Sequence, residues 1–296
     1  MRRILLAAVM FGAASGAQAA DLPDFVPALR GSEGLSTATR NWDGWYAGGQ
    51  VGYQSSSVDF SSTVVGLTNF IFRNSVLQEP TSNWSVLSKN NMQGTGFGAF
   101  GGRNWQWDDL VFGVEANYNY MNRLANSASN SVSLAIPNSG SAPPSHTYTY
   151  NTTINGSAAL QIKDVVTLRG RAGWAAGNFL PYVFGGLAVG RMDVYRSVNT
   201  NVVLQDDQTV TTTDQFGNVT TVALPSVFSQ VPSLSQTNTQ QRTNDFVAGW
   251  TGGLGVEYMV WNGLFLRGEW EYIKFLSVMN TSVSMNSLHL GIGYKF

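Results

Sequence analysis

The chain has 296 residues, of which 32 are glycine, 12% are aromatic and only 12% are charged. Because charged residues usually make up about a quarter of a soluble globular protein, this composition argues against an ordinary soluble domain. A formal charge of −1 gives no support to nucleic-acid binding, which needs a basic face. The absence of cysteine excludes disulfide bonds and a lipid anchor on an N-terminal cysteine.

The N-terminus has the pattern of a cleavable signal peptide covering residues 1–19. Two arginines precede the apolar stretch 4–14, and a small-x-small cleavage site ends at Ala19. The apolar stretch is too short to span a bilayer as a helix, and no later segment has about 18 uninterrupted apolar residues. We therefore expect export, followed by a flexible periplasmic lead-in over residues 20–44.

The rest of the chain alternates between apolar and polar side chains in a series of short segments. The last segment is the clearest example, since Leu288, Leu290 and Ile292 fall on one face while His289 and Gly291 fall on the other. About 9–11 residues is the length of a tilted strand that crosses a bilayer. The eight predicted strands cover residues 45–54, 93–105, 110–120, 165–174, 180–192, 246–259, 264–273 and 287–296.

Long and short connections alternate between the predicted strands. We expect tight turns at 106–109, 175–178 and 260–263, and long loops at 55–91, 122–162, 195–244 and 274–286. The third long loop contains a predicted hairpin over residues 209–224 with a Gly-Asn turn. This alternation is typical of outer-membrane barrels with short periplasmic turns and long extracellular loops. We therefore predict that residues 45–296 form an all-β fold, an eight-stranded antiparallel transmembrane up-and-down β-barrel, and not a soluble β-sandwich.

The strands place a set of charged and titratable side chains on their inward parity, namely Glu115, Arg169, Arg171, Glu257, Arg267, Glu269, Glu271, His289 and Lys295. An eight-stranded barrel is just wide enough for side chains to fill its interior. Because unpaired charges in so narrow a space would be costly, we expect a structural ion-pair network that blocks the lumen. A narrow conductance path gated by these pairs is the alternative.

We expect no catalytic, cofactor or metal site. Ser287 and His289 neighbour Glu269 and Glu271, the residue types of a hydrolytic triad, but period-two spacing separates such side chains by about 7 Å. Residues 96–101 match G-x-G-x-x-G, yet they belong to a predicted strand with no helix after it. Two histidines and no cysteine leave no visible set of metal ligands.

Many aromatic residues lie near the ends of the predicted strands, where Trp and Tyr form girdles at the two interfaces of a barrel. We assign to these girdles Trp45, Trp105, Trp107, Trp174, Trp261, Tyr182, Tyr258 and Tyr294. Arg103 has the parity of Trp105, so either its side chain snorkels to the interface or a bulge shifts the register.

Glycine and aromatic motifs recur in the strands in a fixed order: Asp43-Gly-Trp-Tyr-Ala-Gly-Gly-Gln-Val-Gly-Tyr53, Val111-Phe-Gly-Val-Glu-Ala116, Leu168-Arg-Gly-Arg-Ala-Gly-Trp174, Leu180-Pro-Tyr-Val-Phe-Gly-Gly-Leu-Ala188, Gly249-Trp-Thr-Gly-Gly-Leu-Gly-Val-Glu-Tyr258 and Gly291-Ile-Gly-Tyr-Lys-Phe296. This ordered set, with the start Ala20-Asp-Leu-Pro23, resembles the small OmpA-like outer-membrane proteins of alphaproteobacteria, the porin-like and immunogenic surface antigens of the Brucella and Rhizobium group. The resemblance covers all the predicted strands and leaves the loops unmatched.

The resemblance implies an eight-stranded barrel that the outer-membrane assembly machinery inserts through the terminal strand ending at Phe296. It also implies a structural or surface-exposed role, with outer-membrane lipid and lipopolysaccharide as surroundings and an extracellular ligand or host surface as a partner of the loops. A small porin, or a channel that binds a haem-like ligand, is the alternative. The loop 195–244 is larger than the family leads us to expect, and no peptidoglycan-binding domain follows Phe296, so cell-wall anchoring is not implied.

Overall fold

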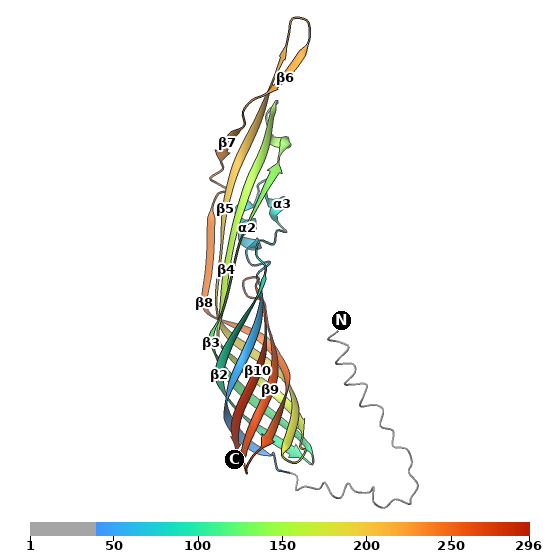
Figure 1. The fold of residues 1–296 in the computed structure, drawn as a ribbon, viewed down its shortest axis with the longest axis vertical. Helices are drawn as coiled ribbons and strands as arrows, with labels where there is room; N and C mark the ends of the chain where they lie inside the picture. The colour runs from blue at the N-terminus through green and yellow to red at the C-terminus, as the bar shows by residue number, and fades with distance from the viewer. Residues whose placement is uncertain (1–39) are drawn as a thin grey trace, which may run out of the picture. The chain divides into compact units, whose positions relative to one another are not determined.

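Residues 40–296 are described by a computed structural model, in which eight antiparallel strands form a barrel (Figure 1). The barrel strands are β1 (Gly44–Asp59), β2 (Lys89–Trp107), β3 (Leu110–Pro137), β4 (His146–Trp174), β5 (Phe179–Thr213), β8 (Thr237–Met259), β9 (Leu264–Phe275) and β10 (Ser282–Lys295). Each predicted strand lies within one of these or overlaps it, in the same order, so the predicted fold class is confirmed. The predicted signal peptide and most of the lead-in lie outside the described residues.

The barrel closes because the first strand pairs with the last. The β1–β10 ladder runs from Tyr46 opposite Lys295 to Asp59 opposite Ser282, and every other neighbouring pair around the ring is antiparallel as well. Closure satisfies the backbone groups that an open edge would leave unpaired, as a lipid environment requires. In the described part of the chain, no helix is long and apolar enough to cross a membrane.

The outward face of the barrel wall is apolar. Val51, Phe97, Leu187, Leu254 and Leu290, from five different strands, expose between 56% and 68% of their surface. Their neighbours in sequence point inward and are mostly polar or glycine. This is the period-two pattern of a wall with lipid on one side and a polar interior on the other.

Four strands continue beyond the barrel as an open sheet, which we call the sheet extension (Figure 1). Its residues are 124–137 of β3, 146–162 of β4, 194–213 of β5 and 237–242 of β8. The register shifts at one level in all three of its strand pairs, after Tyr120, Ile162 and Met192. Such bulges bend strands, and here they mark where the sheet leaves the ring.

The sheet extension corrects the prediction of long loops at 122–162 and 195–244, most of which is strand. These segments look like loops because Ser, Thr and Asn dominate them. Their other parity is apolar, however, and Ile154, Leu160, Val194 and Val198 are buried. The strands form because this apolar side is covered, and backbone pairing tolerates hydroxyl and amide side chains on the opposite side.

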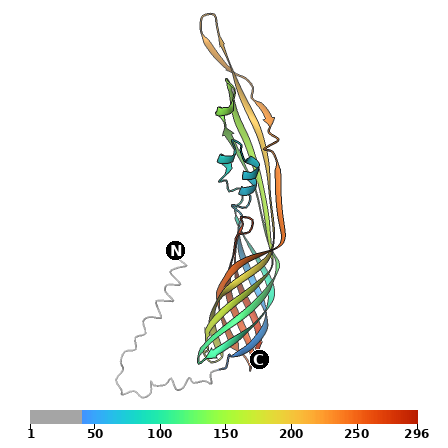
Figure 2. The same cartoon turned by 180° about the vertical axis from the view of Figure 1, so that it is seen from behind.

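Residues 60–88, predicted as an outer loop, supply that cover (Figure 2). They contain the short helices α2 (Val65–Phe72) and α3 (Gln78–Thr81). Phe60, Phe72 and Leu77 are fully buried in the same cluster as Ile154 and Leu160 of the sheet extension. One hydrophobic core therefore continues from the upper end of the barrel into the sheet extension. A 3-10 turn at Ser139–Ser141 connects β3 to β4.

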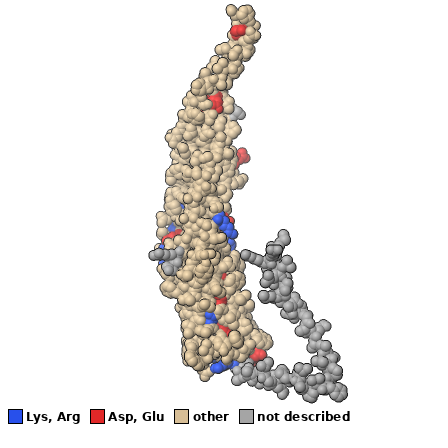
Figure 3. Space-filling model, in the orientation of Figure 1, with Lys and Arg blue, Asp and Glu red and all other residues tan. Residues whose placement is uncertain are grey.

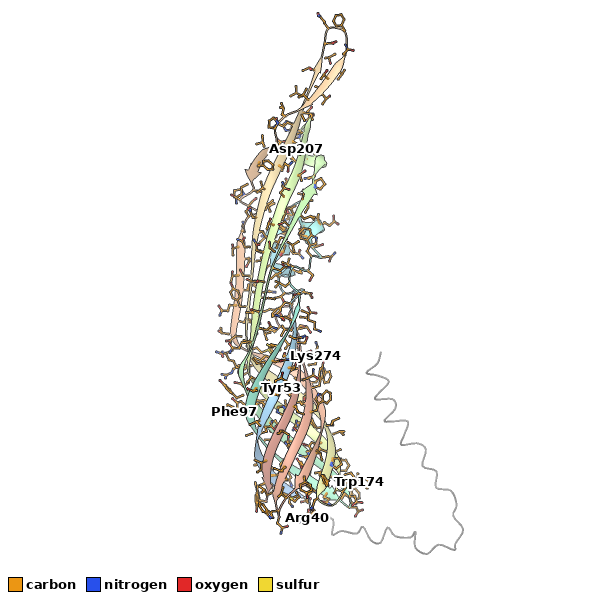
Figure 4. The ribbon with its side chains drawn as sticks, viewed as in Figure 1. Arg40, Tyr53, Phe97, Trp174, Asp207 and Lys274 are labelled. Carbon is orange, nitrogen blue, oxygen red and sulfur yellow. The ribbon has the colours of Figure 1, made fainter. Side chains whose placement is uncertain are left out.

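The far end of the sheet extension is a hairpin, at the position that the sequence predicted. The end of β5 pairs with β6 (Val219–Ala223), from Thr209 opposite Ala223 to Thr213 opposite Val219. Gly217 has φ +85° in the connecting turn, a conformation that favours glycine. A further short strand, β7 (Val227–Gln230), pairs with β5 below the hairpin. Figure 4 labels Asp207 near this end of the sheet.

The end of the lead-in, residues 40–43, closes the opposite end of the barrel. Arg40 donates hydrogen bonds to Asn178 Oδ1 at 3.0 Å and Asn262 Oδ1 at 2.6 Å, in two of the tight turns. Trp42 is 1% exposed, and its backbone N–H donates to Gln106 Oε1 at 2.6 Å. These contacts place residues 40–43 across the barrel mouth. Figure 4 shows Arg40 at this end and Lys274 at the other end of the barrel.

Candidate functional site

The inward-facing charges gather in the middle of the barrel. Glu115, Glu257, Glu269, Glu271, Arg169, Arg171, Arg267 and His289 come from five strands and are each 5% exposed or less. Strand registers place them at neighbouring levels, since Glu115 lies opposite Arg169 and Glu257 lies opposite Arg267. The alternation of the strands puts these side chains inside, and closure of the ring brings them into contact.

Glu115 is the centre of the cluster. Arg169 Nε donates to its Oε1 at 2.9 Å, Arg171 Nη1 donates to its Oε2 at 3.2 Å, and Arg267 donates to both oxygens. The Tyr46 hydroxyl donates to Oε2 at 2.7 Å. One carboxylate therefore receives hydrogen bonds from three guanidinium groups, which compensates for the cost of removing it from water.

Glu257 and Glu269 extend the cluster on either side of Glu115. Glu257 Oε1 accepts from Arg267 Nε at 3.0 Å and from Arg171 Nη1 at 2.8 Å. Arg169 Nη2 lies 2.7 Å and 2.6 Å from the two oxygens of Glu269. Each of the three arginines pairs with more than one carboxylate, so removing one arginine would leave more than one acid without its partner.

Glu271 and His289 form the upper end of the cluster. Glu271 Oε1 accepts from the Thr251 hydroxyl at 2.8 Å and lies 3.5 Å from Arg169 Nη1. His289 Nε2 lies 3.3 Å from Glu271 Oε2. Three guanidinium groups thus face four carboxylates and one imidazole.

Aromatic rings lie against the guanidinium planes. Arg267 stands 3.7 Å from the Phe100 ring centroid, Arg169 stands 3.9 Å from that of Phe184, and Arg171 stands 3.9 Å from that of Tyr182. A guanidinium over a ring face is attracted by the ring quadrupole, and more strongly when both are desolvated. The rings hold the arginines in place and exclude water from the cluster.

Side chains close the lumen below and above the charges. Below, Phe265 packs against Trp42 and Tyr46 with centroid distances of 6.4 Å and 6.0 Å. Above, Gln50 Nε2 donates to Asn119 Oδ1 at 2.7 Å, both residues being buried. Higher still, Ile273, Phe275 and Met285 are buried and belong to the core beneath the helices. Buried side chains therefore occupy the lumen at each of these levels.

Two of the predicted site residues lie apart from the cluster. Lys295 is partly exposed at the end of β10, where its Nζ donates to the Asp43 carbonyl at 2.8 Å. It has inward parity, but its strand position puts it below the aromatic layer. Phe296 is 72% exposed, and its backbone N–H donates to the Trp45 carbonyl at 2.9 Å.

The structure also shows which way Arg103 and Tyr182 face. The sequence left the facing of Arg103 open and assigned Tyr182 to an aromatic girdle. Arg103 lies outward, 5.6 Å from the Trp45 ring and 5.5 Å from the Trp105 ring, and its ladders with β1 and β3 have no bulge. It therefore takes the snorkelling arrangement. Tyr182 was assigned to a girdle, but it is 4% exposed, and its hydroxyl donates to Glu269.

The aromatic partners of the arginines are the residues that sequence reasoning missed. Tyr46, Tyr182 and Phe184 lie on the inward parity of β1 and β5, where aromatic residues look the same as girdle residues in a sequence. The signal was available in β5, because Val183 and Leu187 on the opposite parity already supply an apolar outward face.

Ser287 and His289 do not form a nucleophile and base pair. Among the described residues, the Ser287 hydroxyl has no hydrogen-bond partner, and the acid nearest to His289 is Glu271, an ion-pair member. Nucleophilic catalysis requires a hydrogen bond between nucleophile and base. Within residues 40–296, no group of His, Asp and Glu side chains could hold a metal ion.

The family model described as outer membrane protein beta-barrel domain matches residues 4–296. A search of curated proteins found no match. Among solved structures, the chain is similar to Ail of Yersinia pestis, with 11% identity, a TM-score of 0.32, and coverage of 86% of this chain and 99% of Ail. It is also similar to neisserial surface protein A, with 13% identity, a TM-score of 0.30, and coverage of 85% of this chain and 97% of that protein. For the N-terminal barrel of Pseudomonas aeruginosa OprF the identity is 11% and the TM-score 0.25, with coverage of 83% of this chain and 97% of that barrel.

Proposed function

The chain belongs to the family of outer membrane protein beta-barrel domains, and from this premise we propose that it is a non-conducting barrel that displays a β-sheet at the cell surface. Its location is the outer membrane. The proposed role is structural and surface-exposed, without catalysis and without a bound cofactor. The nearness to the alphaproteobacterial antigens rests on the strand motifs alone.

The single observation that carries the closed lumen is the central cluster of three arginines and four glutamates. Arg267, Glu115 and Glu257 are each 3% exposed or less, and they join strands on different sides of the ring. An ion could pass only if these pairs separated. Breaking a buried pair costs about 3–5 kcal/mol, because it leaves a charge uncompensated in a dry site.

The proposed orientation puts the tight turns in the periplasm and the sheet extension in the medium. Outer-membrane barrels have short periplasmic turns and long extracellular segments, and here the turns at 108–109, 175–178 and 260–263 share one end. Residues 40–43 and Phe296 lie at that end too, as a chain delivered from the periplasm requires. The proposed signal peptide, residues 1–19, fits this route.

We further propose that the assembly machinery recognises the terminal strand. Phe296 is largely exposed, and β10 pairs with β1, so it is the strand that completes the ring. Phe296→Ser should reduce the amount of folded, heat-modifiable protein in outer membranes, whereas Phe216→Ser at the distal hairpin should not. Equal folded yields for the two variants would contradict the role of Phe296.

Planar-bilayer recordings test the closed lumen. Purified protein should give no steady, discrete conductance steps, whereas a variant with Glu115→Ala, Arg169→Ala and Arg267→Ala should give small ones if it remains folded. Steady steps from the unaltered protein would overturn the proposal and favour the alternative of a small porin. Heat-modifiability on gels establishes that each sample is folded before recording.

A further inference from the structure

We propose that one face of the sheet extension binds an uncharged polysaccharide. The polysaccharide that we assign to this face is the O-polysaccharide of lipopolysaccharide in the same membrane. The face is the side of the sheet extension opposite the helices α2 and α3, and we call it the polar face. The proposal rests on the orientation given under the proposed function. It is carried by rows of hydroxyl and amide groups that contain no charged residue, and by two hollows.

The first row crosses four strands. Ser129 lies opposite Ser157, Ser157 opposite Ser197, and Ser197 opposite Thr239. The hydroxyl oxygens of Ser197 and Thr239 are 2.8 Å apart. Adjacent strands are about 4.8 Å apart, so the row presents hydroxyl groups at a short, regular interval.

The next row has the same arrangement with amides in place of two hydroxyls. Ser131, Asn155, Asn199 and Thr237 are successive register partners. Asn199 Nδ2 donates to Thr237 Oγ1 at 2.6 Å, and Asn155 Nδ2 lies 3.4 Å from Asn199 Oδ1. These bonds orient the amides but use only part of their capacity, since each amide has two donors and two acceptor lone pairs. A sugar hydroxyl, which both donates and accepts, suits such groups.

The polar face is hollowed in two places. Ser131, Asn155, Ser157 and Asn199 line a hollow of about 440 Å³ in the middle of the rows. A second hollow, of about 540 Å³, lies nearer the barrel. Shallow neighbouring hollows along one sheet face suit an extended chain more than a compact small molecule.

Tyr195 lines the second hollow and exposes 37% of its surface. Its row contains Ser127, Ala159 and Gln241, all small or uncharged. The small side chain of Ala159 beside Tyr195 leaves the ring accessible. An exposed aromatic ring with a polar tip can pack on the C–H face of a sugar ring and also bond to its hydroxyls.

No row of the polar face described above contains Asp, Glu, Lys or Arg. Asp193 lines the second hollow on its barrel side, where its carboxylate pairs with Lys163 Nζ at 2.8 Å. Figure 3 likewise shows few charged side chains on the part of the sheet extension in view. An anionic or cationic ligand would gain little here. Protein interfaces are enriched in aromatic residues, Met and Arg and depleted in Ser, so this serine-rich face favours a glycan.

The position of the polar face selects the occupant. The hollow of Tyr195 lies just beyond the register shift after Met192, where the sheet leaves the barrel. In the proposed orientation this level stands above the outer leaflet, and the rows of Ser157 and Asn155 lie farther out along the strands, where the O-polysaccharide of lipopolysaccharide surrounds the protein. The local concentration of that chain is high, so many weak hydroxyl contacts suffice for occupancy.

Binding is measured with the full chain, folded in nanodiscs, against lipopolysaccharide from the strain that carries it. We expect the protein to bind smooth lipopolysaccharide and its isolated O-polysaccharide, and to bind rough lipopolysaccharide and heparin at least about tenfold more weakly. Tyr195→Ala and Ser157→Glu should each weaken O-polysaccharide binding by about tenfold, which corresponds to about 1.4 kcal/mol. Tyr148→Ala, on the opposite side of the same sheet, and Thr220→Glu, at the distal hairpin, are the matched controls.

Several results would overturn the proposal. Equal affinity for smooth and rough lipopolysaccharide, preference for heparin, or equal loss in the control variants would each remove the polar face as the site. Dextran binding as well as the O-polysaccharide would overturn the assignment to lipopolysaccharide. Conductance does not enter this assay, so a conducting lumen would refute the proposed function and leave the binding result intact.

Discussion

Arg267 and Glu115 bridge the barrel from wall to wall. Arg267 belongs to β9 and Glu115 to β3, and these strands are four positions apart in a ring of eight, so they stand on opposite sides. Arg267 Nη1 lies 3.2 Å from Glu115 Oε1, and its Nη2 also contacts Glu115 Oε2. The two residues are 152 positions apart in sequence. The two side chains therefore meet across the lumen at that level.

Replacing Arg267 should destabilise the folded barrel strongly. Arg267→Met removes the donor shared by Glu115 and Glu257 and leaves two buried carboxylates less compensated. We expect the free energy of unfolding, measured by urea titration in lipid vesicles, to fall by about 3–5 kcal/mol.

Arg242→Met is the control for this experiment, because the Arg242 side chain is 62% exposed and, among residues 40–296, forms only a surface ion pair with Asp245. It should change the free energy of unfolding by less than about 1 kcal/mol. Adding Glu257→Gln to Arg267→Met should recover part of the loss. A loss below about 1 kcal/mol in Arg267→Met itself would contradict the view that these charges depend on one another.

Two adjacent glycines in β5 test which side of the wall faces the lumen. A Cβ on Gly186 would lie 2.1 Å from the Leu168 carbonyl oxygen, whereas a Cβ on Gly185 would have its nearest neighbour, the Thr251 carbonyl oxygen, at 3.7 Å. Gly186→Val should therefore lower the free energy of unfolding by about 1–3 kcal/mol or more, since backbone must shift.

Gly185→Val should be tolerated, because its side chain would point to lipid, where valine is favourable. The same urea titration compares the two variants at these adjacent positions of β5. If Gly185→Val were the more damaging substitution, the facing of β5 would be the reverse of the one described.

The distal hairpin should loosen in acid through Asp214. The Asp214 carboxylate accepts hydrogen bonds from the Asn218 side chain at 2.9 Å and from the backbone N–H groups of Asn218 and Phe216 at 2.9 and 2.8 Å. These hydrogen bonds hold the pKa of Asp214 below its usual value of 3.8, and the bond from the Asn218 side chain has the largest effect. A lowered pKa means that the stabilisation is present above pH 3.8 and is lost as the pH falls through the lowered pKa.

Amide hydrogen exchange at Phe216 and Asn218 as a function of pH checks this expectation. After correction for the intrinsic pH dependence of exchange, protection should decrease in the acid range in the unaltered protein. In Asp214→Asn the decrease should be absent, since the amide does not titrate. Persistence of the same decrease in Asp214→Asn would assign the effect to another group.

The sequence by itself determined the wall of the barrel. Side-chain facing in a strand follows a period of two, which is a local property, so the eight strands and the inward parity of Glu115 and Arg267 could be read without a structure. The apolar outward parity, as at Leu290, follows from the same rule. Tyr182 is the exception, because an aromatic residue near a strand end looks the same in a sequence whether it faces lipid or the lumen.

Only the tertiary structure decided which charged side chains pair in the lumen and which segment covers the sheet extension. Ring closure brings Arg267 to Glu115 across the lumen, and no local pattern encodes a contact between opposite walls. The sheet extension was hidden because its exposed side is polar, and its strands persist because Phe60, Phe72 and Leu77, from a distant segment, cover Ile154 and Leu160. Burial of one side by residues remote in sequence made strands of segments whose composition indicates loops.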